Sequence, residues 1–199
     1  MRYQLPITRK QMLSASGLAL ATALVAAGPA LRAQSFQGTP VSTFGNVSIF
    51  ATLSATDVTV SSPSAVINWV PNDTNTTGGP INFQPTGTTA TFRNNPDLTS
   101  DFTVLNRIVP SGSTRAIQFN GNVVSRLQTQ AGQVAGGTVF FYSPGGILIG
   151  SSGAFDVGNL VLTTSDLAYD ASGNFGSNGQ YVFQQATVAG AQVSLAPGA

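Results

Sequence analysis

The stretch Gly137–Thr164 reads GTVFFYSPGGILIGSSGAFDVGNLVLTT and is the most regularly punctuated part of the chain. Its apolar runs are short and are separated by Gly, Ser, Pro or Asn: Val139–Tyr142, Ile147–Ile149, Ala154–Val157 and Leu160–Leu162. Helices need longer apolar runs and do not carry a turn signal about every six residues. The stretch therefore predicts short strands that are joined by tight turns and buried on at least one face.

The same rhythm of short apolar runs and turns continues on both sides of this stretch. The composition of Ser165–Leu167 fits a short capped helical turn, but no long amphipathic helix is predicted anywhere. The fold class is therefore predicted to be all-β. Further strands are expected at Val47–Ala55, Val58–Val60, Ala65–Trp69, Ile81–Phe83, Ala90–Phe92, Phe102–Val109, Ala116–Gly121, Val123–Leu127, Tyr181–Phe183, Thr187–Ala189 and Gln192–Leu195.

A sandwich, a barrel and a parallel β-helix all use short strands. Sandwiches and barrels need hairpin turns, and only Asn120-Gly121 has the composition of one. A β-helix instead repeats three very short strands per coil, which favours a single-stranded parallel β-helix of about seven or eight coils, each of roughly 20–22 residues. Because an open end exposes unpaired strand edges, the fold needs a cap. We expect an N-terminal β cap at Phe44–Ala55.

The composition narrows the kinds of chemistry that the chain can perform. It contains no Cys, no His and no Glu, and its seven acids are all Asp. The usual zinc ligands and the usual general base near neutral pH are therefore missing, and no disulfide framework is possible. We expect no enzyme activity, no catalytic residues, no cofactor and no metal.

Residues 1–33 have the pattern of a signal peptide. Arg2, Arg9 and Lys10 form a positive region, and the uncharged, apolar segment Leu13–Ala30 follows them. Small Ala33 precedes Gln34, so cleavage is predicted between these two residues. The alternative is a transmembrane anchor, for which this Ala-, Ser- and Gly-rich segment is weak and short.

Removal of this segment would leave residues 34–199 with four Arg and seven Asp, a net charge of −3. A slightly acidic chain without Lys offers no basic surface for phosphates. Nucleic acid is therefore not expected as a partner.

Five segments resemble, in order, the landmarks of one known family: Val66-Ile67-Asn68-Trp69, Ile81-Asn82-Phe83-Gln84-Pro85, Val104-Leu105-Asn106-Arg107-Ile108, Val139–Ile147 and Leu160–Thr164. This is the haemagglutination-activity, or two-partner-secretion, domain at the N-terminus of filamentous-haemagglutinin-like exoproteins. The resemblance covers Val47–Leu167. It implies a right-handed parallel β-helix and a non-catalytic role in directing secretion of an adhesin-type surface protein.

The resemblance also implies partners and a location. The general secretory translocon would export the chain to the periplasm of a Gram-negative bacterium. The POTRA domains of a dedicated outer-membrane β-barrel transporter would then recognise it and pass it to the cell surface. Residues 34–199 would be the N-terminal part of a longer exoprotein, whose remaining part could bind host or surface glycans.

Two family motifs indicate candidate sites, as transporter-recognition or fold-nucleating turns. The family motif Asn-Pro-Asn-Leu corresponds to Asn95, Pro96, Asp97 and Leu98. The motif Asn-Pro-Asn-Gly-Ile corresponds to Ser143, Pro144, Gly145, Gly146 and Ile147, where both Asn are replaced. Pro and Gly should preserve that turn, whereas any contact made by the Asn side chains is in doubt.

Two other functions are compatible with a secreted β-helix. A polysaccharide-processing enzyme would need acids and bases that converge on one face, and the candidates are Arg93, Asp97, Asp101 and Arg107. A passive matrix fragment would instead bind glycans through outward Ser, Thr and Asn side chains.

Overall fold

The computed structural model describes residues 35–73, 78–98, 100–176, 180–184 and 188–199. Within these ranges the chain forms strands and no helix, so the prediction of an all-β fold is confirmed. No described segment is a helix long and apolar enough to cross a membrane. The strands are β1 (Gly38–Phe44), β2 (Val47–Ala51), β3 (Ala55–Val60), β4 (Ser64–Pro71), β5 (Ile81–Gln84), β6 (Thr89–Asn94), β7 (Thr103–Ile108), β8 (Ile117–Phe119), β9 (Asn122–Thr129), β10 (Gly132–Ala135), β11 (Thr138–Tyr142), β12 (Ile147–Ile149), β13 (Ala154–Asp156), β14 (Asn159–Thr163) and β15 (Val193–Leu195).

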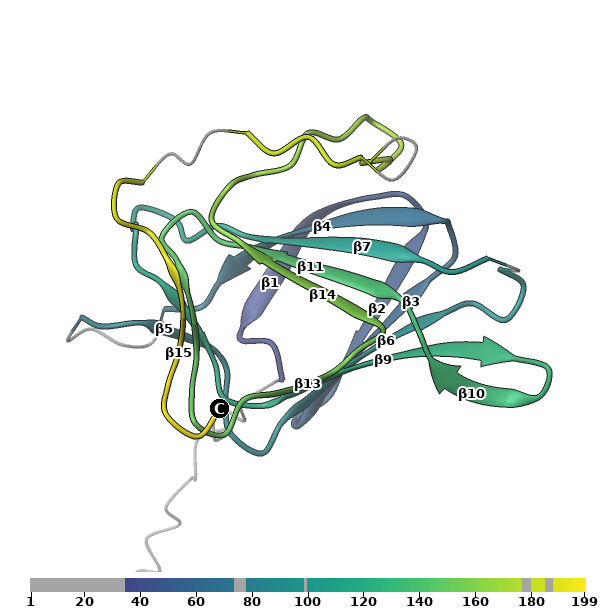
Figure 1. Ribbon diagram of the computed structural model, residues 1–199, viewed down its shortest axis with the longest axis horizontal. Helices are drawn as coiled ribbons and strands as arrows, with labels where there is room; N and C mark the ends of the chain where they lie inside the picture. The colour runs from purple at the N-terminus through teal and green to yellow at the C-terminus, as the bar shows by residue number, and fades with distance from the viewer. Residues whose placement is uncertain (1–34, 74–77, 99, 177–179, 185–187) are drawn as a thin grey trace, which may run out of the picture. The chain divides into compact units, whose positions relative to one another are not determined.

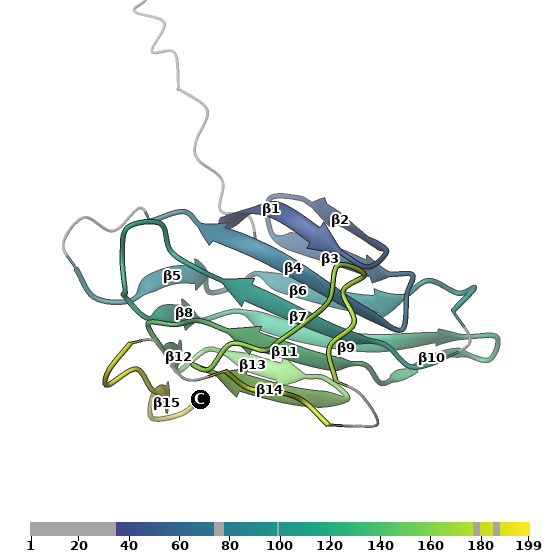
Figure 2. The ribbon, with the colours of Figure 1, turned by 90° about the horizontal axis from the view of Figure 1, so that it is seen from above.

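The strands form three sheets, which the chain visits in a repeating order (Figures 1 and 2). Sheet A has the order β1-β4-β7-β11-β14, and sheet C has the order β15-β12-β8-β5. Sheet B has the order β10-β9-β6-β3-β2, with β13 also paired to β9. From β3 onward the chain passes from sheet B to A to C four times: β3-β4-β5, β6-β7-β8, β9-β11-β12 and β13-β14-β15.

Strands from successive passes pair in parallel, but the repeat is longer than the predicted 20–22 residues. In sheet B, Ala55, Thr89, Asn122 and Ala154 align, at spacings of 34, 33 and 32 residues. The strands of a pass reach eight residues, and the chain between β7 and β8 adds a further connection. The prediction of seven or eight coils is therefore wrong, because it assumed a tight turn after every strand.

Three strands pair antiparallel, so the sheets are mixed and are not a single right-handed helix. β1 pairs with β4, β2 pairs with β3, and β10 folds back on β9 as a hairpin. The predicted cap region Phe44–Ala55 contains β2, but it includes only the last residue of β1, for which no strand was predicted. Pro40 is tolerated in β1 because that strand lies at the edge of its sheet.

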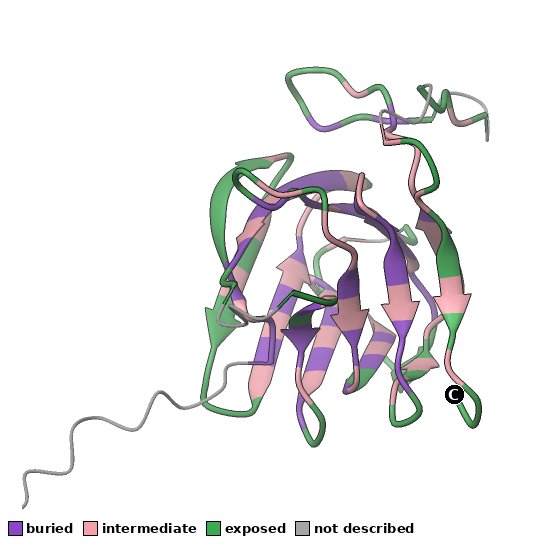
Figure 3. Ribbon diagram, turned by 90° about the vertical axis from the view of Figure 1, so that its left-hand side faces the viewer, coloured by how far each residue is buried: buried purple, intermediate pink, exposed green. Residues whose placement is uncertain are grey.

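The space between the sheets is filled with aromatic side chains. Phe36 lies at the centre, with ring centroids of Phe83, Phe92, Phe119 and Phe141 between 4.8 and 6.3 Å away. Figure 3 shows buried residues on the strands around this interior. Trp69 is 2% exposed and belongs to the same cluster. Trp69 therefore packs in the core.

Sheet A is also apolar on its outward face. Phe44, Val66, Leu105, Phe140 and Val161 align across five strands in one row. Residues 164–176 and 180–184, hereafter the strap, cross this face after β14 (Figure 1). Burial on both faces explains why β4 and β11 contain the continuous apolar runs Ala65–Ile67 and Val139–Tyr142 rather than an alternating pattern.

Four strap side chains pack on the outward row: Leu167, Tyr169, Phe175 and Tyr181. The strand predicted at Tyr181–Phe183 is only a single bridge between Phe183 and Leu167, and no helical turn forms at Ser165–Leu167. Thr187, at the start of another predicted strand, lies outside the described residues.

Candidate functional site

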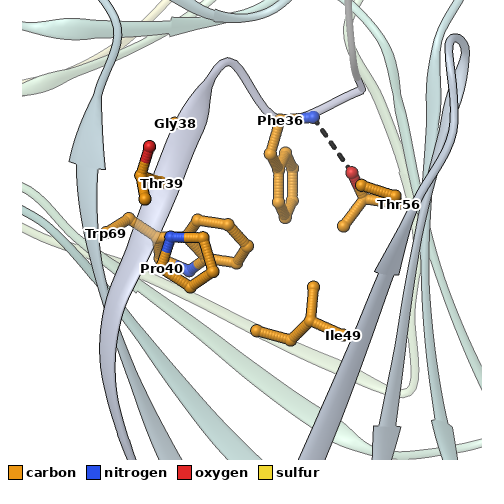
Figure 4. A pocket seen from close by; sticks show the side chains of 8 residues that line it. Phe36, Gly38, Thr39, Pro40, Ile49, Thr56 and Trp69 are labelled. Atoms are coloured by element: carbon orange, nitrogen blue, oxygen red, sulfur yellow. Dashed lines mark hydrogen bonds between the residues drawn. The ribbon is translucent and has the colours of Figure 1, made fainter.

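An apolar pocket lies between β1 and β2, at the N-terminal end of the aromatic core (Figure 4). Its volume is about 270 Å³. The pocket lies where sheets A and B end, because β1 and β2 are the terminal strands of those sheets and are not paired with each other. The lining residues are Phe36, Gly38, Thr39, Pro40, Ile49, Ala51, Thr56 and Trp69.

Hydrogen bonds hold the walls of this pocket, which has both apolar and polar lining residues. The backbone N–H of Phe36 donates to the Thr56 hydroxyl at 3.2 Å. The indole N–H of Trp69 donates to the Asn106 side-chain oxygen at 3.1 Å, and the Asn106 amide donates to the carbonyl of Phe140 at 3.2 Å. The indole N–H thus has its hydrogen-bond partner within the core. Trp69 lines the pocket with the apolar part of its ring (Figure 4).

A second cluster of polar groups lies on the outward face of sheet A, around Arg107. Its Nε donates to Asp166 at 2.8 Å, a second guanidinium nitrogen also bonds that carboxylate, and the third donates to Asn68 at 2.6 Å. The guanidinium lies 5.5 Å from the ring centroids of both Tyr142 and Tyr169. The hydrogen bond with Asp166 raises the pKa of Arg107, against the opposing effect of burial. This cluster fastens the strap to sheet A.

The predicted site Asn95–Leu98 is a tight turn directly after β6. The Asn95 backbone N–H donates to Val60 at 2.7 Å, and its side-chain oxygen accepts the N–H of Asp97 at 3.1 Å. Leu98 packs against the core, whereas Pro96 and Asp97 are exposed. The side chains of Pro96 and Asp97 are therefore accessible to a partner.

Asn94 fixes this turn, although it was not predicted as a site residue. Its side-chain amide donates to the carbonyls of Leu98 and Gln128, at 3.3 and 3.2 Å, and its oxygen accepts the Gln128 N–H at 2.5 Å. Asn94 is only 2% exposed. The Asn-Asn pair before Pro96 is the sequence signal that could have indicated it.

The predicted site Ser143–Ile147 joins β11 to β12 and is largely buried. Ser143 donates its N–H to Thr163 at 3.1 Å, and Ile147 donates to Gln192 at 3.0 Å. Gly146 has φ of 113°, and its carbonyl accepts the N–H of Ile117 at 3.0 Å. This turn therefore connects the second, third and fourth passes of the chain.

Close packing explains why Gly occupies the middle of this turn. A Cβ on Gly145 would collide with the carbonyl oxygens of Thr114 and Arg115, and one on Gly146 would lie 2.9 Å from the carbonyl oxygen of Gln192. The hydroxyl of Ser143 is buried and has no hydrogen-bond partner among the described residues. The turn thus contains an unsatisfied polar atom at Ser143.

The two predicted turns have separate surroundings and do not form one site. The contacts of Asn95 are with the end of β3 and with Ser61, and those of Gly146 are with the start of β8 and with Gln192. The predicted cleavage position at Ala33 and Gln34, with the whole predicted signal peptide at 1–33, lies outside the described residues.

The residues that a polysaccharide-processing enzyme would use have different partners. Arg93 pairs with Asp57, and Arg107 pairs with Asp166. Asp101 accepts the backbone N–H groups of Phe102 and Gly137, at 2.7 and 2.8 Å. Among the described residues no group of three or more acids is placed to hold a metal ion.

The pocket between β1 and β2 was missed at the sequence level. Its walls come from Phe36–Pro40, from Ile49 and from Trp69, which are separated in sequence and meet only in the folded chain. Comparison of the whole chain with known proteins finds no matching family model, no similar curated protein and no similar solved structure. The family resemblance of the five segments therefore stays a prediction.

Proposed function

We propose that this chain is a non-catalytic, secretion-directing module of a bacterial surface or secreted protein of the adhesin type. In this proposal it crosses the periplasm and is recognised there by the POTRA domains of a dedicated outer-membrane transporter. The observation that carries the proposal is the repeated passage through sheets B, A and C, with parallel pairing between passes. Parallel pairing between passes supports the proposal, because the family resemblance implies a fold built from parallel strands.

The finer fold that belongs to this proposal is a right-handed parallel β-helix formed by the parallel strands among β3–β15, to which β10 is added as an antiparallel hairpin strand. The antiparallel strands β1 and β2 would then be its N-terminal cap, since each ends a sheet on the side of the first pass. Antiparallel edge strands interrupt the stacking of parallel strands. At β1, Pro40 lacks the N–H with which a further strand would pair, so stacking would stop at this edge.

The two predicted turns have different roles in this proposal. Pro96 and Asp97 are exposed, so the Asn95–Leu98 turn is assigned to recognition by the transporter. The Ser143–Ile147 turn is buried against neighbouring passes, so it is assigned to folding after export. Recognition and folding can therefore be tested with separate variants.

The test is secretion from cells that also express a transporter of this class. Pro96→Ala with Asp97→Ala should reduce secretion without changing the stability of the purified chain. Gly146→Ala should yield a chain that folds poorly after release, because φ there is 113° and its Cβ meets Gln192.

Gly132→Ala is the matched control for the folding variant. Gly132 has a similar φ of 121°, but a Cβ there meets no atom within 4 Å. Secretion that does not depend on the transporter would contradict the proposed function. Equal folding of Gly146→Ala and Gly132→Ala would contradict only the role of the Ser143–Ile147 turn.

A further inference from the structure

We propose that the pocket between β1 and β2 binds an extended peptide strand, which pairs with the free edge of β2 and inserts one bulky apolar side chain beside Trp69. The inference does not depend on the proposed export role. It rests on the pocket, on the edges that flank it and on the groups that line it (Figure 4).

The size of the pocket suits a single side chain. Pockets for drug-sized ligands occupy about 300–1,000 Å³, and this one is about 270 Å³. Its walls are the rings of Phe36 and Trp69, which meet edge to face at 5.5 Å, together with Pro40 and Ile49. Such walls favour an aromatic or branched aliphatic group and disfavour a charged one.

The backbone around the pocket supplies the second half of the site. β1 is the last strand of sheet A and β2 is the last strand of sheet B, and each pairs with one strand only among the described residues. β3 and β4, their partners, belong to the same first pass, so both free edges face the same end of the fold. The edge of β2 presents a row of unpaired N–H and C=O groups, whereas Pro40 interrupts the edge of β1 because proline has no backbone N–H.

An edge strand beside a side-chain pocket is the arrangement used in strand addition. Main-chain hydrogen bonds provide affinity, and a pocket that receives one of the alternating side chains provides specificity. Neither edge strand contains a charged residue that would repel an incoming strand: β1 is GTPVSTF and β2 is VSIFA. A neutral, alternating peptide with a central Phe therefore fits the site best.

Trp69 makes the binding measurable, because it is the only Trp in the chain and lines the pocket. The probe is the blocked peptide Thr-Val-Thr-Phe-Thr-Val-Thr, titrated into the full chain while Trp69 fluorescence is recorded. We expect a saturable change in emission. The same peptide with Asp in place of Phe should have an affinity at least about tenfold lower, because it cannot bury its central side chain in the pocket.

Two variants on one strand separate the pocket from the surface around it. Ala51→Leu adds methyl groups at the rim of the pocket and should weaken binding of the Phe peptide by about tenfold. Phe50→Leu changes the neighbouring residue of β2, which does not line the pocket and is 66% exposed, and should leave binding unchanged. Thermal unfolding of both variants confirms that they fold.

Several results would overturn the proposal. No saturable change, or equal binding of the Phe and Asp peptides to the unaltered chain, would show that the pocket does not select a side chain. Undiminished binding by folded Ala51→Leu would place the peptide elsewhere. Equal binding of a peptide methylated at its backbone nitrogens would exclude pairing with a strand edge.

Discussion

The two faces of sheet A are buried in different ways, although the same strands form both. In β11, Phe141 packs inward on Phe36 and Phe119, with ring centroids 6.1 and 4.8 Å away. The adjacent Phe140 packs outward on Phe175 and Tyr181, at 5.4 and 4.8 Å. Both phenylalanines are fully buried, yet sheets enclose the first and the strap covers the second.

The two phenylalanines are buried to the same extent, but the two faces differ in whether they become exposed only when the whole domain unfolds. The inward cluster draws residues from all three sheets, so it can be exposed only if the sheets separate. The strap is joined to the rest by side-chain packing, by the Arg107 cluster and by hydrogen bonds such as that from Ser64 to Gly173. A segment with few backbone bonds opens at a lower free energy than the whole domain. We therefore expect the outward face to be exposed first.

The largest expected effect tests the inward face. Phe141→Ala should lower the free energy of unfolding by about 3–5 kcal/mol, because it leaves a cavity among aromatic rings that cannot close around it. Urea unfolding monitored by Trp69 fluorescence measures this loss. A smaller loss for Phe141→Ala than for Phe140→Ala would contradict the comparison.

Phe140→Ala tests the outward face at the neighbouring residue. The strap can detach or settle into the space, so we expect a loss of about 1.5–3 kcal/mol, close to the value for exposing one large apolar side chain. Amide hydrogen exchange should accelerate at Leu167 and Ala168 but not at Ile67 in sheet A. Acceleration of the same size at both places would mean that strap and sheets open together.

Replacement of Arg107 examines what holds the strap. Arg107→Met removes the bonds with Asp166 and Asn68 and the contacts with two tyrosine rings, and should cost about 1–2 kcal/mol. Arg93→Met is the matched control, since it removes a more exposed ion pair, with Asp57, and should cost about 1 kcal/mol or less. Equal losses in thermal unfolding would show that the Arg107 cluster is only another surface pair.

The smallest effect concerns pH and is confined to the strap. Asp170 accepts bonds from the Asn174 side chain and from backbone N–H groups, which lower its pKa below the ordinary value of 3.8. A lowered pKa in the folded state means that its contribution is fully present above about pH 5 and is lost as the pH falls through the folded pKa.

Hydrogen exchange at Asn174 between pH 6 and pH 3, corrected for the intrinsic rate, measures this loss. Asp170→Asn, which cannot titrate, should remove the dependence on pH in this range. Persistence of the same dependence in Asp170→Asn would assign it to another group.

Most strands could be predicted because they depend on local pattern. Short apolar runs separated by Gly, Ser and Pro correctly indicated β4, β6, β11 and β12. The hairpin strand β10 was missed because GQVA has no strong strand composition and is held by its register with β9. Asn120-Gly121, the one predicted hairpin signal, instead links β8 in sheet C to β9 in sheet B.

The candidate sites were less predictable than the strands. The turns at Asn95–Leu98 and Ser143–Ile147 do lie between strands, as expected. Whether each turn is exposed or buried depends on which passes lie beside it. The pocket beside Trp69 also depends on the tertiary structure, because it lies between β1 and β2, the terminal strands of two different sheets.

The sequence by itself determined the all-β class, because backbone turns and short apolar runs act over a few residues. Only the tertiary structure decided the long repeat, the antiparallel strands β1, β2 and β10, and the burial of sheet A on both faces. These features depend on pairing between distant segments, and one residue pattern is compatible with several such pairings. The pairing that forms is the one that satisfies the backbone hydrogen bonds and buries the apolar faces.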